Sequence, residues 1–438
     1  MLKKTGVAVA LLGMLALSSL LMSCGSGHDR RAGILYVVSQ SLSNISSFAV
    51  DLFNGDLSLI TENLASTCPP STTCGLPLTI SVDPTGATAF VLTQLGVTGF
   101  NVNSDGSLST PIATVPTDAA PFPANHTALA MTSTAAGDML FLISVGQPNP
   151  TDCDPAVGPL GSDCPMISVY STQPGSTTAT LTGNNCAANA GGPCSYPLSR
   201  VPTAISAVNF TFPGQPTHTV LFVTSNHDLT TAHNDSTLSV FSVDSSGNLA
   251  EQSASPYSAQ APNPLSVLAV NTNPPQQNTG GVFVYVGSQA AVTGSVSTFE
   301  VCTQVDTNCN QGDVDNENLA VTGKPLTVGQ NPIAMLADPT HTFLYIACYV
   351  GNNVYAFKMT TGTGILTPLS PALEPTGAGP VSLAINPSNN NSNEYLYVSN
   401  NTGSTLSGYT VNLTTGGLSN PLAPFIFTPG NPYGLAGR

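Results

Sequence analysis

The stretch that decides the fold runs from Asn331 to Leu369 and reads NPIAMLADPTHTFLYIACYVGNNVYAFKMTTGTGILTPL. It contains four apolar runs, of which the last is short: 333–337, 343–347, 354–356 and 365–367. Turn-forming residues separate them: Asp338-Pro339, Gly351-Asn352-Asn353 and the segment from Gly362 to Gly364. Alternation at a period of two, bounded by Gly, Pro, Asn and Asp, predicts a meander of four antiparallel strands and no helix.

The same pattern recurs along the chain, and the second run of each copy centres on an aromatic residue. Successive copies are separated by 54, 51, 81, 63, 60 and 52 residues. Repeats of roughly 40–50 residues, each forming a four-stranded sheet, are typical of β-propellers. We therefore predict an all-β fold, a seven-bladed propeller of four-stranded antiparallel blades centred on Tyr36, Phe90, Phe141, Phe222, Tyr285, Tyr345 and Tyr397.

The C-terminus supplies the strand that the first copy lacks. Residues 431–436, NPYGLA, resemble the opening strand of the other copies, whereas the first copy starts at Ile34 without one. The C-terminal strand is therefore expected to complete the first blade. Closing the ring in this way hides its strand edges.

The first 23 residues form a predicted lipoprotein signal peptide. Lys3 and Lys4 precede an apolar run over 7–22, and Leu21-Met22-Ser23-Cys24 resembles a bacterial lipobox. The run is short for a membrane span and its flanks fit a signal peptide; a true anchor helix is the alternative. Cleavage would leave Cys24 acylated, residues 24–33 as a tether and residues 34–438 as the propeller. With Gly25 rather than Asp at the next position, we expect an exported, membrane-anchored protein at the outer membrane or cell surface.

Charge and composition narrow the classes of partner. Only 7% of the 438 residues are charged, and 23 acidic residues face 8 basic ones. Removal of Lys3 and Lys4 leaves 23 acidic against 6 basic residues, a net charge of −17. An acidic exterior argues against nucleic acid and anionic lipid as partners. We expect a monomer that contacts the membrane through its lipid alone and binds a small molecule or a protein at the propeller face.

Eight cysteines fall into four close pairs within Pro-, Asn- or Gly-rich insertions. In an exported protein such pairs indicate disulfides that pin loops; metal binding, which prefers tighter spacing, is the alternative. Cys348 has no such neighbour and lies in an apolar run, as expected for a core thiol. The predicted pairs are Cys68 with Cys74, Cys153 with Cys164, Cys186 with Cys194, and Cys302 with Cys309.

Three insertions distinguish this chain from a bare repeat array. Two of them, at 146–165 and 183–197, account for the wide gap between the third and fourth copies. A third runs from Cys302 to Lys324. Insertions of this size often carry function.

The repeats resemble those of the seven-bladed β-propeller lactonases, the family of bacterial 6-phosphogluconolactonase, and the related YVTN-repeat surface proteins. The likeness rests on Pro332…Asp338-Pro339…Phe343-Leu344-Tyr345-Ile346 and on Val282-Phe283-Val284-Tyr285-Val286, and it spans Ile34 to the C-terminus. The resemblance implies the propeller fold. It also implies, for an active member, a hydrolase that opens the ester bond of a sugar lactone or a related lactone.

The family's charged positions are mostly neutral in this sequence. The resemblance places a histidine at the start of the third blade, and His126 in Asn125-His126-Thr127-Ala128 matches it. The expected arginine and histidine of the fourth blade, the glutamate after its second strand and the arginine of the fifth blade are replaced. Those positions hold Thr203, Ala204, Asn226 and Gln289.

Two candidate catalytic residues remain, His126 and Arg200. Lactone hydrolysis needs an acid or base and a cation near the developing oxyanion. A histidine suits either proton-transfer role, but His126 also fits a hydrogen-bonded channel residue. Arg200 is the sole arginine between Arg31 and Arg438 and either reaches the channel or makes a surface contact.

Two polar clusters contain metal-ligand residue types. His227, Asp228, His233 and Asp235 fall close together after the fourth blade's second strand, and His and Asp side chains bind zinc and other divalent metals. Their spacing matches no known motif, so turn formation is the alternative. Oxygen-bearing residues at 313–317 suit Ca²⁺ but lack the glycine and distal glutamate of an EF-hand. No resident cofactor is expected, with a divalent metal as the exception.

Three functions remain open from the sequence. The first is a surface-displayed propeller that binds a ligand or protein without turnover, favoured by the replaced charges. The second is a lactonase-type hydrolase that uses His126. The third is a structural scaffold of the cell envelope, because propellers serve many functions.

Overall fold

The computed structural model describes residues 31–60, 65–66, 75–83, 85–94, 96–116, 126–134, 137–145, 164–172, 181–183, 194–211, 217–229, 235–272, 281–290, 292–301, 319–386, 394–421, 426–427 and 430–438. The signal peptide, Cys24 and most of the tether lie outside these residues, so the lipid anchor stays a prediction. Within the described ranges, no helix has the length and hydropathy needed to span a membrane.

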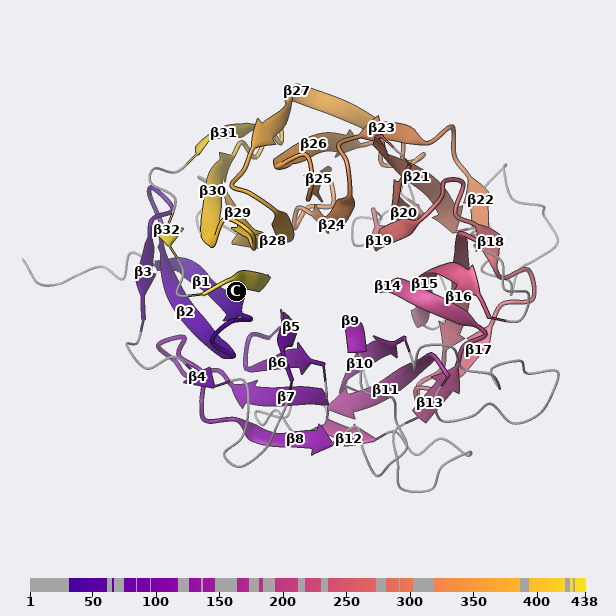
Figure 1. The fold of residues 1–438 in the computed structure, drawn as a ribbon, viewed down its shortest axis with the longest axis horizontal. Coiled ribbons are helices and arrows are strands. Elements are labelled where there is room, and N and C mark those ends of the chain that lie inside the picture. The colour runs from indigo at the N-terminus through magenta and orange to yellow at the C-terminus, as the bar shows by residue number, and fades with distance from the viewer. Residues whose placement is uncertain are drawn as a thin grey trace, which may run out of the picture.

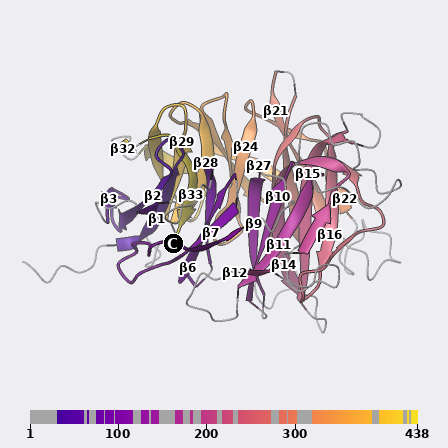
Figure 2. The ribbon, with the colours of Figure 1, turned by 60° about the horizontal axis from the view of Figure 1, so that its bottom comes forward.

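Seven antiparallel sheets are arranged in a ring around a common axis (Figure 1), and a tilted view shows their strands side by side (Figure 2). The predicted seven-bladed propeller is confirmed. Blade 1 contains β1 (Arg31–Ser39), β2 (Asn44–Asp51), β3 (Leu57–Leu59), β4 (Ala65–Ser66) and β33 (Pro432–Gly437). Blade 2 contains β5 (Pro77–Val82), β6 (Thr88–Thr93), β7 (Gly96–Asn101) and β8 (Ile112–Pro116). Blade 3 contains β9 (His126–Thr134), β10 (Gly137–Ser144), β11 (Met166–Thr172), β12 (Leu181–Gly183) and β13 (Cys194–Pro197).

The remaining four blades repeat this order, with the first strand of each nearest the axis. Blade 4 contains β14 (Arg200–Thr211), β15 (Thr217–Asp228), β16 (Thr237–Val243), β17 (Leu249–Glu251) and β18 (Tyr257–Ser258). Blade 5 contains β19 (Pro264–Asn271), β20 (Val282–Gln289), β21 (Gly294–Val301), β22 (Leu319–Val321) and β23 (Leu326–Val328). Blade 6 contains β24 (Pro332–Ala337), β25 (Phe343–Cys348), β26 (Asn353–Met359) and β27 (Leu366–Pro375). Blade 7 contains β28 (Pro380–Asn386), β29 (Glu394–Asn400), β30 (Thr405–Val411), β31 (Leu418–Pro421) and β32 (Ile426–Phe427).

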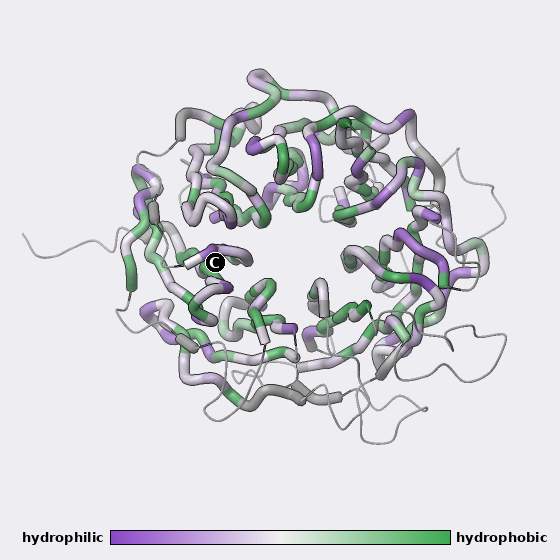
Figure 3. Tube along the Cα trace, in the orientation of Figure 1, coloured by the Kyte–Doolittle hydropathy of each residue, from purple (hydrophilic) through white to green (hydrophobic). Residues whose placement is uncertain are grey.

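The hydrophobic core is divided into seven layers, one between each pair of adjacent blades. Successive side chains of a strand point to opposite faces of the sheet. In β15, for example, Leu221 packs against blade 3 and Phe222 against blade 5. Because both faces are covered, the central residues of each second strand are apolar, and Figure 3 shows such hydrophobic segments in every blade. The seven predicted central aromatic residues are all at most 2% exposed.

The predicted ring closure is confirmed, because β33 pairs antiparallel with β1 as the innermost strand of blade 1. Two glycines allow it to fit tightly between its neighbours. A Cβ on Gly434 would lie 2.7 Å from the Thr79 Cα in blade 2, and one on Gly437 would lie 2.3 Å from the Ile385 carbonyl oxygen in blade 7. The last eight residues therefore join three blades.

Tyrosine hydroxyls tie four pairs of neighbouring blades together. In each case the central tyrosine of a second strand donates to the carbonyl oxygen of a glycine in the turn between the third and fourth strands of the next blade. Such a hydrogen bond contributes about 1 kcal/mol net. The pairs are Tyr36–Gly106 (3.0 Å), Tyr285–Gly364 (2.9 Å), Tyr345–Gly416 (2.9 Å) and Tyr397–Gly55 (2.7 Å).

The turn geometry explains why the residue that accepts each of these hydrogen bonds is a glycine. All four glycines have a positive φ, between 63° and 88°, a conformation that other residues adopt only under strain. At Gly364 a Cβ would also lie 2.4 Å from the Phe283 ring. Burial raises the pKa of Tyr36 to about 12 and shifts the pKa of the other three tyrosines upward as well, so all four remain protonated donors near neutral pH.

One predicted strand is longer than expected. The sequence predicts a short fourth strand at 365–367, whereas β27 extends over Leu366–Pro375. Its residues are mostly exposed or half-buried, because it forms the outer edge of blade 6. An edge strand of this kind shows no strong apolar alternation, which is why the pattern underestimates its length.

The insertions fall at three different places in the blades. Residues 146–163 lie between β10 and β11, residues 184–193 between β12 and β13, and residues 302–318 between β21 and β22. Both β12 and β13 pair with β11, so the second insertion interrupts an outer strand of blade 3.

Two cysteines are described with their side chains, Cys348 and Cys164. Cys348 is free and fully buried, as predicted, and burial raises the pKa of its thiol to about 12. Cys164 is buried and disulfide-bonded, and its predicted partner Cys153 lies outside the described residues.

The other predicted disulfides are not tested by the structure. Cys194 begins β13, but its side chain is not described. The structure therefore shows none of the four predicted pairs as a bridge, and all four stay predictions. The cysteines outside the described residues are Cys68, Cys74, Cys153, Cys186, Cys302 and Cys309.

Candidate functional site

The inner strands all begin on one face of the ring, called the entry face below, and six of them carry a proline at or near their start. In each blade this position pairs with a small polar or thiol residue near the end of the second strand or, in blade 1, of β1. In blade 3 the position belongs to His126, opposite Ser144. The equivalent pairs elsewhere are Pro77–Thr93, Pro202–Ser225, Pro264–Ser288, Pro332–Cys348, Pro380–Asn400 and Pro432–Ser39.

His126 therefore differs from the residue at the equivalent position of the other six blades, which is a proline. A register shift at the same point of all seven blades shows a repeated bulge, which re-aims the chain at the mouth of the ring. At this position of the inner strand, blade 3 alone has a titratable residue. The sequence contains the signal, a proline at the start of the other inner strands, but only the register reveals that His126 replaces it.

The neutral residues at the family's charged positions make structural contacts. The Thr203 hydroxyl donates to the Thr224 carbonyl oxygen at 3.2 Å. Ala204 packs against the core layer between blades 4 and 5. The Gln289 side-chain oxygen accepts the Asn331 amide, and its nitrogen donates to the Ala290 carbonyl oxygen. Asn226 is half-buried near the end of β15.

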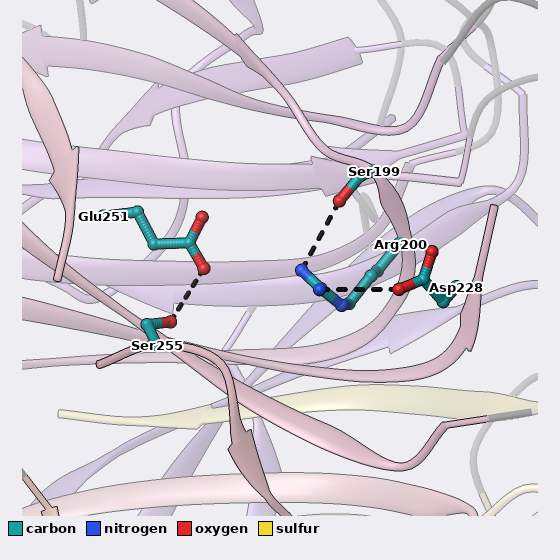
Figure 4. A network of polar contacts seen from close by, with 5 residues as sticks. All are labelled: Ser199, Arg200, Asp228, Glu251 and Ser255. Carbon is teal, nitrogen blue, oxygen red and sulfur yellow. Dashed lines mark hydrogen bonds and ion pairs between the residues drawn. The ribbon is translucent and has the colours of Figure 1, made fainter. Parts of the chain in front are cut away.

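Arg200 begins β14 and pairs with Asp228 at the end of β15. One terminal nitrogen, Nη2, lies 3.4 Å from the Asp228 carboxylate, and Nη1 lies 3.4 Å from the Ser199 hydroxyl (Figure 4). The Arg200 side chain is 21% exposed and that of Asp228 is 8% exposed. Charge-assisted hydrogen bonds are normally about 2.7–2.9 Å long, so both contacts are loose. The Arg200 Nε is buried without a partner among the described residues.

A pocket of about 260 Å³ opens beside Arg200 at the interface of blades 3 and 4. Its apolar lining belongs to the core layer between these blades, and its polar lining comes from serines, Arg200 and Glu251. Tyr196 of β13 closes one side, where its hydroxyl oxygen accepts the Leu249 amide of β17 at 2.7 Å. The structure thus places Arg200 in a cavity between two blades, and the neighbouring inner strand β9 begins at His126.

Charged residues are unevenly distributed over the entry face. In blades 5, 6, 7 and 1, the described loops on this face consist of neutral residues: 259–263, 289–290, 292–293, 329–331, 349–352, 376–379, 401–404, 430–431 and 40–43. In blade 4 the same face carries Arg200, Asp228 and the exposed Asp235. In these five blades, the charged residues at the described entry face therefore lie at blade 4, apart from Glu374 near the end of β27 in blade 6.

The predicted metal clusters remain untested. His227 is half-buried at the end of β15, one residue before Asp228, while His233 lies outside the described residues. In the part of the chain that is described, no three His, Cys, Asp or Glu side chains gather as a metal site. The acidic segment 313–317 also falls outside it.

One buried carboxyl group has a strongly altered pKa, but it lies away from Arg200. Glu394 begins β29 in blade 7, where burial, followed by the nearby Asp338 carboxylate, raises its pKa to about 7. Perturbed pKa values often mark functional sites. Here the group is 7% exposed and lies at the interface of blades 6 and 7 beside Tyr345, whose hydroxyl already bonds Gly416.

No protein-family model and no curated protein matches this chain. Solved structures do. The periplasmic gluconolactonase PpgL of Pseudomonas aeruginosa superposes with a TM-score of 0.60 at 14% identity, covering 92% of this chain and 98% of that one. A protein of Bacteroides uniformis, provisionally assigned as a 6-phosphogluconolactonase, gives 0.58 at 13% identity over 93% and 100% of the two chains. The likeness is one of fold.

A third structure agrees with these two. A Bacteroides fragilis protein with the same provisional assignment gives a TM-score of 0.57 at 14% identity, over 94% of this chain and 99% of its own. The predicted resemblance to lactonase-type propellers is therefore confirmed at the level of the fold. The roles of individual residues rest on the contacts described above.

Proposed function

We propose that this protein is an exported, lipid-anchored propeller that binds a ligand or a partner protein at its entry face and does not hydrolyse lactones. The observation that carries the proposal is that the positions expected to be catalytic hold neutral residues, whose side chains make structural contacts. Thr203, Ala204 and Gln289 are committed to hydrogen bonds or packing within the propeller. They supply neither a cation nor an acid or base.

The distribution of charge supports the same function. Neutral amide, hydroxyl and apolar residues cover the described entry-face loops of four blades in a protein with a net charge of −15. Such a surface does not repel an anionic partner as a uniformly acidic surface would. It suits binding of a small molecule or a protein, as expected from the sequence.

The lactonase-type hydrolase is the second candidate, and His126 is the observation that favours it. This residue is the exception among seven otherwise equivalent positions, and the fold neighbours include a gluconolactonase. Arg200 would supply the cation. A purely structural role in the envelope is the third candidate, which the pocket at blade 4 makes less suitable.

We expect purified mature protein to show no hydrolysis of 6-phosphogluconolactone or of neutral lactones above the uncatalysed rate. Loss of one preorganised donor typically costs about 10²–10³ in rate, so the loss of several charged groups should leave little turnover. The measurement is release of acid at constant pH, with His126→Ala and Arg200→Ala as matched variants. Turnover that disappears in either variant would establish the hydrolase instead.

The membrane anchor is tested separately in cells. We expect the protein to incorporate labelled palmitate, and the Cys24→Ser variant to lose both the label and its membrane association, because the thiol that carries the lipid is gone. Equal labelling of the variant would show that Cys24 is not the lipidated residue.

A further inference from the structure

We propose that the pocket between blades 3 and 4 binds the zwitterionic form of an apolar α-amino acid, with Arg200 holding its carboxylate and Glu251 its ammonium group. The proposal rests on the proposed function, since it names the ligand of a binding propeller. It follows from the opposite charges on two walls of one pocket and from the apolar surface between them.

The two charged groups lie on the same pocket and face each other. Arg200 comes from the start of the inner strand and Glu251 from the outer strand β17, and both line the cavity. Figure 4 shows Nη1 of Arg200 on the side toward the Glu251 carboxylate. No ion pair joins the two residues, although a guanidinium and a carboxylate in contact would form one. The pocket therefore presents a cation and an anion separately.

Arg200 has more hydrogen-bond donors than its described contacts use. Its guanidinium carries five N–H groups, yet among the described residues it makes only the two contacts of 3.4 Å, to Asp228 and Ser199, and its Nε has no partner. Because Asp228 contacts Nη2, the neighbouring nitrogen Nη1 is left with a weak hydroxyl contact. A ligand carboxylate at Nη1 would replace that contact with a charge-assisted hydrogen bond.

Glu251 has a carboxylate oxygen that can accept a further hydrogen bond. Ser255 donates its hydroxyl hydrogen to one carboxylate oxygen, Oε1, at 2.7 Å, which fixes the orientation of the group. The second oxygen remains available to a ligand ammonium group. A carboxylate oriented by a neighbouring hydroxyl is a preorganised acceptor, so it loses little freedom when the ligand binds.

The space between these groups is small and partly apolar. Four core residues form the apolar part of its lining: Leu198, Val223, Phe241 and Leu249. A volume of about 260 Å³ is just below the range of roughly 300–1,000 Å³ typical of pockets for drug-sized ligands. An amino acid with a branched or aromatic side chain matches this size, with its side chain against the apolar lining.

The position in the fold explains why a pocket can form at this interface. The central aromatic residue of blade 3 is Phe141, which has no hydroxyl to bind the turn of blade 4. Tyr196, further out, bonds the Leu249 amide instead. The interface is thus closed from its outer side, and the pocket lies between that contact and the inner strand.

Titration calorimetry with L-leucine tests the proposal, together with two analogues that each lack one charged group. The analogue 4-methylpentanoate lacks the ammonium group, and 3-methylbutylamine lacks the carboxylate. We expect L-leucine to bind at least roughly tenfold more tightly than either analogue, because each loses a charge-assisted contact. Saturable binding of L-leucine with this preference supports the proposal, and no heat of binding at millimolar concentrations overturns it.

Two variants assign the charged groups. Arg200→Gln should weaken L-leucine and 4-methylpentanoate roughly tenfold or more and leave 3-methylbutylamine unchanged. Glu251→Gln should weaken L-leucine and the amine and leave the carboxylate analogue unchanged. Glu374→Gln, in the outer strand β27 of blade 6, is the matched control and should change nothing. Because Arg200→Gln removes the guanidinium that contacts Asp228, Arg200→Lys is included as a variant that keeps the charge and should restore part of the affinity.

The outcomes separate this proposal from the proposed function. Equal affinities in the wild type and in both charge variants would overturn the amino-acid site, while the absence of lactone hydrolysis would still stand. Lactone turnover that requires Arg200 would instead make the same pocket part of an active site. It would then overturn the binding function itself.

Discussion

A variant that ends at Gly430 should lose most of its stability and aggregate, because it lacks the strand that closes the ring. Without β33, the edge of β1 exposes unpaired backbone groups, and the buried Leu435 no longer covers its neighbours. A buried leucine contributes about 1.5–3 kcal/mol and each backbone hydrogen bond about 0.5–1.5 kcal/mol. Together, the burial of Leu435 and the backbone hydrogen bonds between β33 and β1 approach the total stability of a typical domain, about 5–15 kcal/mol.

The measurement is the melting temperature of the truncated protein together with its elution in size-exclusion chromatography. A synthetic peptide of residues 430–438 should restore both, because it can occupy the vacated position beside β1. Restoration by the peptide separates the loss of one strand from a general defect in folding. An unchanged melting temperature of the truncated protein would contradict ring closure by β33.

The second large effect concerns pH, and Glu394 should make the protein less stable as the pH rises from about 4.5 to about 7. Burial, and then the Asp338 carboxylate, raises the pKa of Glu394 from 4.5 to about 7 in the folded protein. Asp338 is 3% exposed and accepts the amides of Thr340, Thr342 and Phe343, which hold it in place. Below pH 4.5, Glu394 is protonated in both the folded and the unfolded state, so its contribution is then fully present.

As the pH increases, the unfolded chain ionises first while the folded protein still holds the proton, and stability falls until the folded pKa is passed. The shift corresponds to a loss on the order of 3 kcal/mol. A Glu394→Gln variant cannot ionise and should not show this loss. It should be more stable than the wild type at pH 8 by about that amount and similar to it at pH 4.5.

Denaturant midpoints of both proteins at the two pH values measure the effect. Glu374→Gln is the control, since it removes one negative charge without removing this buried carboxyl group. A stability difference between Glu394→Gln and the wild type that is the same at pH 4.5 and pH 8 would contradict the assignment.

The fold can be predicted from the sequence because its information is local and repeated. Each second strand is covered on both faces, so its central aromatic residue, such as Phe90 or Tyr285, stands in an apolar run that is visible without a structure. The closure is also visible, because residues 431–436 repeat a pattern found elsewhere. Edge strands such as β27 lack this signal, since one side faces solvent.

The candidate site can be predicted only in part, because it depends on contacts between residues distant in sequence. Arg200 and His126 stand out as unusual residues in the sequence alone. The pocket, however, requires Tyr196 of one blade to meet Leu249 of the next, and the importance of His126 depends on its register with Ser144. Neither follows from local pattern, since the sequence does not specify how adjacent blades pack.

The tyrosine-to-glycine hydrogen bonds bear on where foreign loops can be grafted. Each of these tyrosines contacts a short turn in the next blade: 52–56, 360–365, 412–417 and, in blade 2, the turn 103–107 that the Val102–Leu108 bridge closes. Blades 3 and 5 follow Phe90 and Phe222, and their corresponding connections are the longer segments 173–180 and 302–318. Blade 4 keeps a short turn after Phe141, and there Tyr196 makes the contact instead. The connections of blades 3 and 5 are thus the points at which no described tyrosine-to-glycine hydrogen bond limits the length of an added sequence.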